Sequence, residues 1–512
     1  MDTKALRQKV LDLAIRGKLV PQDTNDEPAS VLLERIRQQK QQMVKDGKLK
    51  AKDIKNDTII FVGEDNLHYE KFADGSVKCI EDEIPFELPD GWAWARFSTI
   101  TINRDSERKP ISSSQRTGVE KIYDYYGASG KIDKIDKYIF CERLLLIGED
   151  GANLVTRSKP IAFFAEGLYW VNNHAHCIDS PDKLLLEYLC FYINAISLEK
   201  YVTGSAQPKM TQDNMNSILI PLPPYNEQKR LSQHLDEIMA MVDRIEIGKI
   251  ESIELISKAK SKILDLAIRG QLVPQDPDDE PASVLLERIR AEKEELIKQG
   301  KLKRDKKESV IFRGEDNSYY EKMADGKLHC LDDQLTFELP DGWEWCNLSM
   351  IGTTNIGLTY RPTDIEPGGI MVLRSCNIVN DQFDLSDLVR VKTTVRENQF
   401  AQKNDILICA RNGSRSLVGK CALIPDLGEP ASFGAFMAIY RTEYFEFIVH
   451  YLRSSFFRSV FDDSNSTAIN QLTQDMLKRA IVPLPPLSEQ RRIVEAIDAM
   501  LFELNQIEKS LS

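Results

Sequence analysis

The sequence predicts an α+β protein. Two mixed α/β domains are joined by two long antiparallel coiled-coil helical arms, and the whole has internal pseudo-two-fold symmetry. The first observation is a set of repeated segments: LDLAIRG at 11–17 returns at 264–270, and EPASVLLERIR at 27–37 returns at 280–290, both after 253 residues. The second is that FELPDGW (86–92) returns after 251 residues and PLPP (221–224) after 262. The third is that the stretches between FELPDGW and PLPP share almost no sequence. A repeat this long indicates a duplicated domain rather than a solenoid.

The repeats divide the chain into a frame and two inserts. The frame has an N-terminal arm helix, a polar helix and turn segment in two copies, and two PLPP motifs, each leading into an arm helix. The expected boundaries are 1–18 for the N-terminal arm, 19–90 and 271–341 for the polar segments, 91–216 and 342–478 for the inserts, 217–270 for the central arm and 479–512 for the C-terminal arm.

Composition limits the class of protein. With 512 residues and 42% hydrophobic content, the chain can bury several cores. Its nine cysteines form no CxxC pair, which disfavours a disulfide framework or a zinc site. The charged N-terminus and the lack of any apolar run of membrane-spanning length predict a cytoplasmic protein with no membrane partner. The net charge of −12 argues weakly against a nucleic-acid partner, but a basic face can coexist with an acidic whole.

Each PLPP motif precedes a helix with an apolar seam of heptad type. Asn226 and Ser488 are the expected N-caps. A narrow seam flanked by charged residues favours another helix as partner, so each seam is expected to pack against the other; the alternative is that each helix packs on its own globular domain. The seam residues are Leu231, Leu235, Ile238, Val242 and Ile245 in the first copy and Ile493, Ile497, Met500, Leu504 and Ile507 in the second.

The ends of the chain complete this pattern. Residues 4–17 copy 257–270, so joining Ser512 to Met1 would nearly rebuild the central helix. The chain is therefore predicted to be close to a circle, cut within one of two equivalent arms.

The polar segments are predicted to hold one helix each, at 29–45 and 282–299, followed by tight turns and short strands. Their charge indicates a solvated outer layer or a docking face for another protein. In the inserts, β-branched and aromatic runs predict strands, for example at 144–148, 161–164, 406–410 and 436–440. Each insert is expected to end in an apolar helix (184–198; 445–461), followed by a polar loop from Gly204 or Ser466.

Catalytic motifs are incomplete or absent. Leu222-Pro223-Pro224-Tyr225 resembles the motif of adenine methyltransferases but has Leu where a polar residue must bind the target amine. Residues 413–420 differ from a P-loop in spacing and have Cys421 in place of the Ser or Thr that holds Mg²⁺. His174 and His176 alternate on a possible strand without Cys or acidic partners at ligand spacing, so no metal is expected. We therefore predict no catalytic, cofactor-binding or metal-binding residue.

The inserts do offer loops suited to DNA, because Arg, Asn, Gln, Lys and Ser side chains can bind phosphates and base edges. The loop at 411–415 is the strongest candidate, since two Arg and one Asn follow a predicted strand; a solvated turn is the alternative. For Asn173 and His174 the alternative is that they only satisfy backbone groups. The candidates are Tyr126, Ser129, Lys131, Asn153, Asn172, Asn173, His174, Ser205, Gln207 and Lys209 in the first insert and Arg374, Asn377, Arg411, Asn412, Ser414, Arg415, Thr467, Asn470 and Gln471 in the second.

The pattern resembles the specificity subunit of a Type I restriction–modification system. The resemblance rests on the paired PLPP-x-x-EQ motifs, the heptad helices behind them and the repeated LDLAIRG-x-LVPQD and FELPDGW segments, and it covers nearly the whole chain. It implies that the inserts are target recognition domains, each reading half of a split site in double-stranded DNA. It further implies arms that dock two methyltransferase subunits, motor-nuclease subunits that join the complex, and no catalysis by this chain. S-adenosylmethionine, ATP and Mg²⁺ would be used by the partner subunits.

Unlike inserts on a two-fold frame predict two different half-sites and an asymmetric full site. Two other classes of function remain as alternatives. One is a DNA methyltransferase or nuclease acting alone, and the other is a protein scaffold that binds no DNA. The sequence identifies neither the bases recognised nor the spacer length.

Overall fold

The computed structural model describes residues 2–117, 120–204, 207–301, 304, 308–462 and 471–511. The chain forms two compact units, Met1–Gly248 and Lys249–Ser512, and the boundary between them along the chain falls within the 44-residue helix α8 (Tyr225–Ile268). Three candidate residues, Ser205, Thr467 and Asn470, lie outside the described residues, as do Met1 and Ser512.

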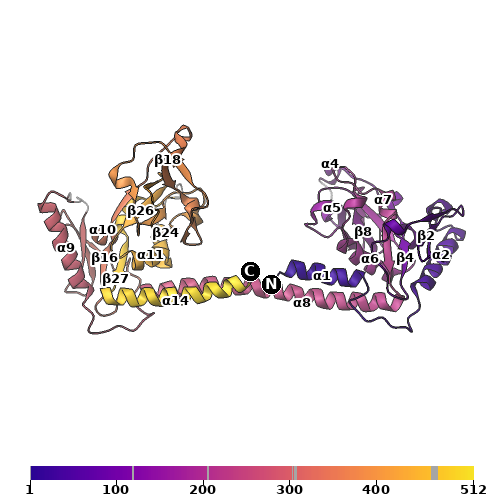
Figure 1. The fold of residues 1–512 in the computed structure, drawn as a ribbon, viewed down its shortest axis with the longest axis horizontal. Helices are drawn as coiled ribbons and strands as arrows, with labels where there is room; N and C mark the ends of the chain where they lie inside the picture. The colour runs from indigo at the N-terminus through magenta and orange to yellow at the C-terminus, as the bar shows by residue number, and fades with distance from the viewer. Residues whose placement is uncertain are drawn as a thin grey trace. The chain divides into compact units, whose positions relative to one another are not determined.

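Unit 1 contains the first copy of the frame and the first insert (Figure 1). Its helices, besides the first part of α8, are α1 (Thr3–Ile15), α2 (Ala29–Lys45), α3 (Phe97–Ile100), α4 (Ser113–Arg116), α5 (Asn153–Thr156), α6 (Lys183–Ala195) and α7 (Gln212–Asn216). Its strands are β1 (Ile59–Val62), β2 (His68–Lys71), β3 (Val77–Cys79), β4 (Ala93–Arg96), β5 (Ile102–Asn103), β6 (Tyr123–Gly127), β7 (Gly130–Ile135), β8 (Leu144–Gly148), β9 (Ala162–Ala165), β10 (Tyr169–Val171), β11 (Ala175–Asp179) and β12 (Leu219–Leu222).

Unit 2 contains the second copy and the second insert. Its helices, besides the last part of α8, are α9 (Ala282–Lys298), α10 (Leu348–Ile351), α11 (Phe445–Arg453), α12 (Ser455–Asp462), α13 (Gln474–Arg479) and α14 (Leu487–Leu511). Its strands are β13 (Ser309–Arg313), β14 (Tyr319–Met323), β15 (Leu328–Cys330), β16 (Glu344–Asn347), β17 (Thr353–Ile356), β18 (Ile365–Leu373), β19 (Ile378–Val379), β20 (Gln382–Phe383), β21 (Val389–Val391), β22 (Phe400–Ala401), β23 (Ile406–Cys409), β24 (Cys421–Leu423), β25 (Ala431–Phe433), β26 (Met437–Arg441) and β27 (Ile481–Leu484).

The two inserts share a topology although they share little sequence. A four-stranded antiparallel sheet has the order β5-β11-β8-β9 in unit 1 and β17-β26-β23-β24 in unit 2. A second sheet contains one parallel pair in each insert, β10 with β6 and β25 with β18. The frame adds a pair of strands, β12-β4 or β16-β27, and a three-stranded sheet, β1-β2-β3 or β13-β14-β15.

The central strands β8 and β23 are buried along their whole length, which explains their uninterrupted apolar runs LLLIG and ILIC. Helix α6 packs on the first four-stranded sheet, and Leu185, Leu189 and Ile193 join Leu145 and Ile147 in the main core of unit 1. In unit 2, Ile448, Val449 and Leu452 of α11 join Ile406 and Ile408 in the same way. The strands and helices of the inserts therefore match the predicted ranges closely, except that residues 445–461 form two helices, which break at Ser454.

Two of the repeated segments, LDLAIRG and FELPDGW, meet in each unit. Gly17 ends α1 with a φ of +64°, and a Cβ there would lie 2.5 Å from Pro89 Cγ of FELPDGW. Gly270 at the end of α8 has a φ of +66°, and a Cβ there would lie 2.4 Å from Pro340 Cγ. Glycine is needed at both positions for its left-handed conformation and for the close approach of the proline ring.

The glutamate of each PLPP-x-x-EQ motif links these segments further. Glu227 accepts hydrogen bonds from Trp92 Nε1 (2.9 Å) and from Gln22 Nε2 (3.0 Å). In unit 2, Glu489 accepts the same bonds from Trp343 (3.0 Å) and Gln275 (3.2 Å). Burial raises the pKa of both carboxyls, and the hydrogen bonds oppose that shift. The motifs occur twice because each copy builds the same buried contact in its own unit.

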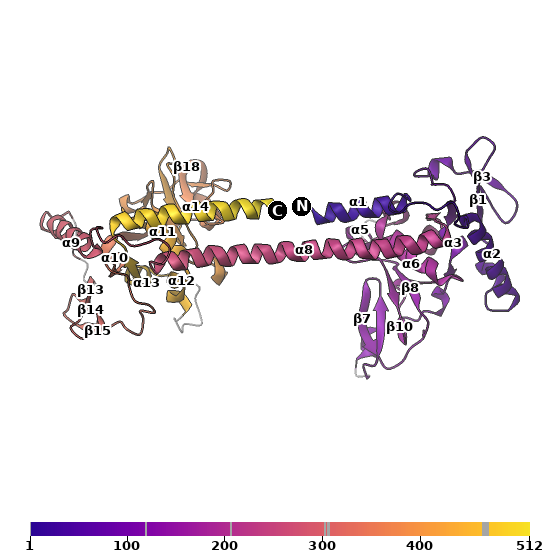
Figure 2. The same cartoon turned by 90° about the horizontal axis from the view of Figure 1, so that it is seen from below.

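The arms differ from the predicted packing. Leu231, Leu235 and Ile238 pack in the core of unit 1 with Val10 and Ala14 of α1. Ile493 and Ile497 pack in the core of unit 2 with Leu264 and Ala267 of α8. For these residues the expectation that the two seams pack against each other is wrong, and the alternative, packing on the helix's own domain, is confirmed. The reason is that the LDLAIRG helix carries a complementary apolar stripe and lies alongside each seam (Figures 1 and 2).

The partner helices run antiparallel. Arg7 of α1 contacts Asp243 and Glu246 of α8, while Gln22, beyond the end of α1, reaches Glu227 near the start of α8. Val242 is also buried, but Ile245, Met500 and Ile507 are 41, 42 and 50% exposed. The predicted seam is therefore covered only at the end near each domain.

The predicted N-caps are also wrong by one or two residues. Helices α8 and α14 begin at Tyr225 and Leu487, so Asn226 and Ser488 lie inside them. The amide of Gln228 donates to the carbonyl of Pro224, and its side chain donates to the carbonyl of Pro223 at 2.9 Å. The side chain of Gln228 thus ties the first turn of α8 back to the proline segment, and Asn226 does not occupy the N-cap position.

Candidate nucleic-acid interface

Three segments meet at the end of strand β8 in the first insert. The amide of Glu149 donates to the carbonyl of His174 (2.9 Å), and the amide of Met210 donates to the carbonyl of Glu149 (2.8 Å). Asp150 and Lys209 form an isolated antiparallel bridge. The backbone therefore joins the segment after β8, the turn before β11 and the polar loop that begins at Gly204. We call this meeting point the first junction.

The second insert builds the same junction from unrelated residues. The amide of Ala410 donates to the carbonyl of Phe436 (2.9 Å), and the amide of Leu472 donates to the carbonyl of Ala410 (2.7 Å). Arg411 and Gln471 form the corresponding isolated bridge. Each of the three backbone contacts named for the first junction thus has a counterpart in this second junction.

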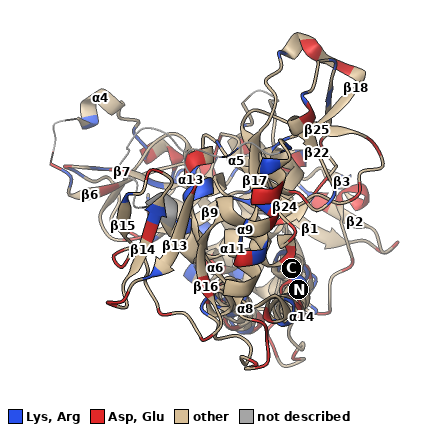
Figure 3. Cartoon of the chain, turned by 90° about the vertical axis from the view of Figure 1, so that its left-hand side faces the viewer, with Lys and Arg blue, Asp and Glu red and all other residues tan. Residues whose placement is uncertain are grey.

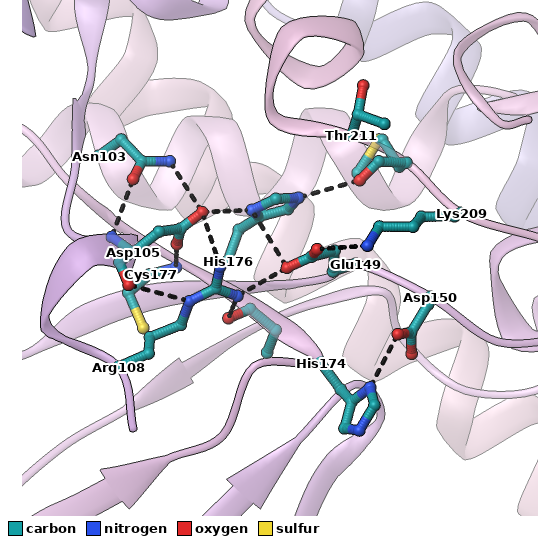
Figure 4. A network of polar contacts seen from close by, with 12 residues as sticks. Asn103, Asp105, Arg108, Glu149, Asp150, His174, His176, Cys177, Lys209 and Thr211 are labelled. Atoms are coloured by element: carbon teal, nitrogen blue, oxygen red, sulfur yellow. Dashed lines mark hydrogen bonds and ion pairs between the residues drawn. The ribbon is translucent and has the colours of Figure 1, made fainter. Parts of the chain in front are cut away.

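The side chains at the first junction are polar (Figure 4). His174 Nδ1 lies 2.7 Å from Asp150 Oδ2, and Lys209 Nζ lies 3.2 Å from Glu149 Oε1. The side chains of His174 and Lys209 are 48 and 51% exposed, whereas Asp150 and Glu149 are 17 and 12% exposed. The two carboxylates therefore hold a histidine and a lysine at the surface.

Beneath them lies a buried ionic network. His176 Nδ1 lies 2.6 Å from Asp105 Oδ2, and its Nε2 lies 3.0 Å from the carbonyl oxygen of Met210. Arg108 Nη1 lies 2.7 Å from Glu149 Oε2. Burial raises the pKa of the Asp105 and Glu149 carboxyls, but bonds and charges from His176 and Arg108 outweigh it, so both pKa values are lower than usual. The network ties Glu149 of the junction to strand β11.

Asp105, Glu149 and His176 lie close enough together to hold a metal ion. The sequence prediction that His176 lacks acidic partners is therefore wrong, because the partners come from distant segments. The donor set nevertheless suits hydrogen bonding better. Both ring nitrogens are already engaged, since Nδ1 faces Asp105 Oδ2 and Nε2 faces the carbonyl oxygen of Met210.

The second junction exposes a cation and an aromatic ring. The guanidinium of Arg411 lies 5.5 Å from the ring centroid of Phe436, and Phe436 is 61% exposed. The amide of Arg411 also donates to the carbonyl of Phe436 (3.0 Å). Asn412 Oδ1 accepts a bond from the amide of Ser414 (3.0 Å), which shapes the loop before Arg415. Arg411, Asn412, Ser414, Arg415 and Gln471 therefore share one surface.

Several predicted residues serve the fold instead. Asn172 is buried and accepts a bond from the amide of His174, and Asn153 binds the backbone of Lys159. Asn377 is fully buried and donates to two backbone carbonyls, while Arg374 pairs with Asp387 at 2.6 Å. These four side chains are engaged by the protein itself.

The remaining candidates differ in accessibility. Asn173 is exposed beside His174, and Gln207 is exposed in the polar loop. Lys131 pairs with Asp124 at 2.6 Å, Ser129 lies in the turn between β6 and β7, and Tyr126 stacks on Phe163 with ring centroids 6.2 Å apart.

The sequence prediction missed Glu149, Asp150 and Arg108 and assigned Phe436 only to a strand. A signal for Phe436 was present. It lies 262 residues after His174, the same offset that separates the PLPP motifs and that separates Gln471 from Lys209. Charges of both signs occur together on single elements, as on β14, where Glu321 and Lys322 are neighbours (Figure 3). None of the described helices is long and apolar enough to cross a membrane.

The sequence was compared with known protein families and structures. The family described as "Type I restriction modification DNA specificity domain" matches residues 100–255 and 340–512, more than half of the chain. The chain belongs to this family. It is a specificity subunit of a Type I restriction–modification system, a class of protein that recognises DNA. The resemblance stated from the repeated motifs is thereby confirmed.

Relatives match over almost the whole length. The EcoAI specificity subunit of Escherichia coli is 28% identical, with 98% of this chain and 90% of the relative covered. The EcoEI specificity subunit of E. coli is 27% identical, with 99 and 90% covered. A chain from a structural study of assembly and conformational transition in the type I R-M system has a TM-score of 0.50 at 17% identity, covering 83% of this chain and 94% of that one, which shows similarity of fold.

Proposed function

We propose that each insert is a target recognition domain that reads one half of a bipartite site in double-stranded DNA. The observation that carries the proposal is the pair of junctions, which have the same backbone contacts and different exposed side chains. One scaffold presenting two chemistries suits two readers of different half-sites. The full site is then asymmetric.

The helical frame serves assembly in this proposal. The arms space the recognition domains and dock two methyltransferase subunits, and the motor-nuclease subunits join that complex. Apolar side chains on the arm helices support a protein partner there: Met241 of α8 and Phe502 of α14 are 52 and 59% exposed. The seam positions Met500 and Ile507 add to this surface on α14.

The chain itself is proposed to be non-catalytic. S-adenosylmethionine, ATP and Mg²⁺ are then used by the partner subunits, and the sequence motifs that would bind them here are incomplete. A methylation assay on the purified chain alone tests this point, because a methyltransferase acting alone would transfer methyl groups without a partner.

Mapping of methylated bases tests the whole proposal. The chain is produced in cells together with its methyltransferase subunit, and methylated bases are located genome-wide. We expect one asymmetric motif made of two specific parts and a non-specific spacer. A scaffold that binds no DNA predicts no motif that depends on this chain, and that result would exclude the proposed function.

A further inference from the structure

Three positions at each junction are equivalent by backbone contacts. Asp150 corresponds to Arg411 and Lys209 to Gln471, because each pair forms the same isolated bridge. His174 corresponds to Phe436, because the carbonyl of each accepts the bond from the residue after the central buried strand. We call these the three junction positions.

The backbone at these positions is rigidly held. In unit 2, the segment at 410–411 is bonded on one side to Phe436 and on the other to Leu472, and strand β23 before it is fully buried. Because this backbone is fixed, the Cα position of each side chain that it carries is fixed as well. Base recognition requires such a rigid support. This support comes from the backbone bonds to Phe436 and Leu472, which lie outside the 411–415 loop.

The side chains at the junction positions differ in hydrogen-bonding capacity. Arg411 carries a planar fork of donors and is exposed, with Phe436 beneath its guanidinium at 5.5 Å. Asp150 is an acceptor that already holds His174, which leaves His174 Nε2 for DNA. The same three places therefore offer a donor fork in unit 2 and a histidine in unit 1.

We propose that the three junction positions determine base specificity in each recognition domain, and that Arg411 reads a guanine in the half-site of the second domain. An Arg fork matches the O6 and N7 acceptors of guanine in the major groove. Phe436 is a positioning residue that holds the guanidinium by a cation–π contact. The assignment rests on the proposed function of the chain in reading DNA.

The test uses the chain in complex with its methyltransferase subunits. Methylated motifs are mapped, and binding is measured against a DNA panel in which each position of the half-site carries every base. Arg411→Ala should leave the complex intact and relax one guanine position, with a loss of discrimination of about 5- to 150-fold. Arg411→Lys should retain part of the preference, and Phe436→Leu should weaken it at that same position. Arg396→Ala removes another exposed arginine of the same domain and should leave the motif unchanged.

The outcomes are distinguishable. If Arg411→Ala and Phe436→Leu keep full discrimination at every position, the assignment is overturned while the proposed function stands. Uniform weakening across all sequences with a shallower salt dependence would place Arg411 on phosphate, and this also overturns the assignment. If the wild-type complex shows no sequence preference, the proposed function fails and the assignment fails with it.

Discussion

Trp92 donates a 2.9 Å hydrogen bond from its indole Nε1 to the buried carboxylate of Glu227, which lies 135 residues further along the chain. Trp343 and Glu489 repeat this bond at 3.0 Å in the second unit. The bond joins the FELPDGW and PLPP-x-x-EQ segments, so it connects the segment that precedes each insert to the segment that follows it. The contribution of this hydrogen bond to stability can therefore be measured independently in each unit.

Trp92→Phe should destabilise unit 1 by about 1–3 kcal/mol, because Glu227 loses a donor and remains buried. Trp343→Phe should do the same in unit 2, and the double variant should show additive losses, since the two sites share no partner. Chemical unfolding followed by hydrogen exchange in each unit measures the effect. Glu237→Gln, on the exposed face of α8, is the matched control. Full stability of Trp92→Phe would contradict the role given to this bond.

Leu235→Glu should destabilise unit 1 by several kcal/mol, roughly the cost of burying an unpaired charge, because Leu235 is 5% exposed among core residues. Ile245→Glu, at a seam position that is 41% exposed, should change the free energy of unfolding little. Sedimentation and thermal unfolding distinguish the two variants. Equal effects would contradict the packing of the seam on its own domain.

The network at the first junction predicts acid sensitivity. The pKa values of Asp105 and Glu149 are lowered in the folded state, so their stabilising contribution is present above the ordinary carboxyl pKa of about 4 and is lost as the pH falls through the lowered values. Hydrogen-exchange protection of β8 and β11 should fall in that pH range more than protection of β23 and β26. In the second insert, Ala410 and Ala438 stand at the positions of Glu149 and His176, so these two members of the ionic network are missing there. Asp105→Asn should lower protection at neutral pH and flatten the response. An identical acid response in both sheets would count against this account.

Replacing residues 91–216 with the corresponding domain of another family member should change one half-site and leave the other unchanged. The reason is that the first junction lies wholly inside this insert, while the frame contributes Glu227 and Gln22, which Trp92 at the start of the insert joins. Mapping of methylated bases reports the result. A simultaneous change in both half-sites would show that the domains do not read independently.

Circular permutation tests the prediction that the chain is nearly closed. The repeats predict that Ser512 and Met1 lie close together. A Gly/Ser linker between them, with new termini opened after Gly270, should then be tolerated, because closing a short gap costs little entropy. We expect the permutant to assemble with its methyltransferase and to keep the parental motif. An insoluble or inactive permutant with a long linker would contradict the proximity of the ends.

Local signals in the sequence were enough to identify the frame. Exact repeats identified the segments that converge on Glu227 and Glu489, and uninterrupted apolar runs located β8 and β23, because both signals are local. Family membership also followed from those repeats. The helix starts were missed by one or two residues, because the side chain of Gln228 bonds back to the carbonyl of Pro223, a contact that residue propensities do not show.

How these parts pack together depends on contacts between distant segments. The heptad seam identified its buried residues Leu231 and Ile493 but not their partner, since an apolar stripe packs equally well on any complementary surface. The junctions depend on backbone bonds between segments that are distant in the chain, such as Ala410 with Leu472, and no local pattern encodes them. For this reason the sequence prediction missed Phe436 and Asp150. It also ranked Asn172 and Asn377 as DNA-binding candidates, although both side chains bond to the backbone.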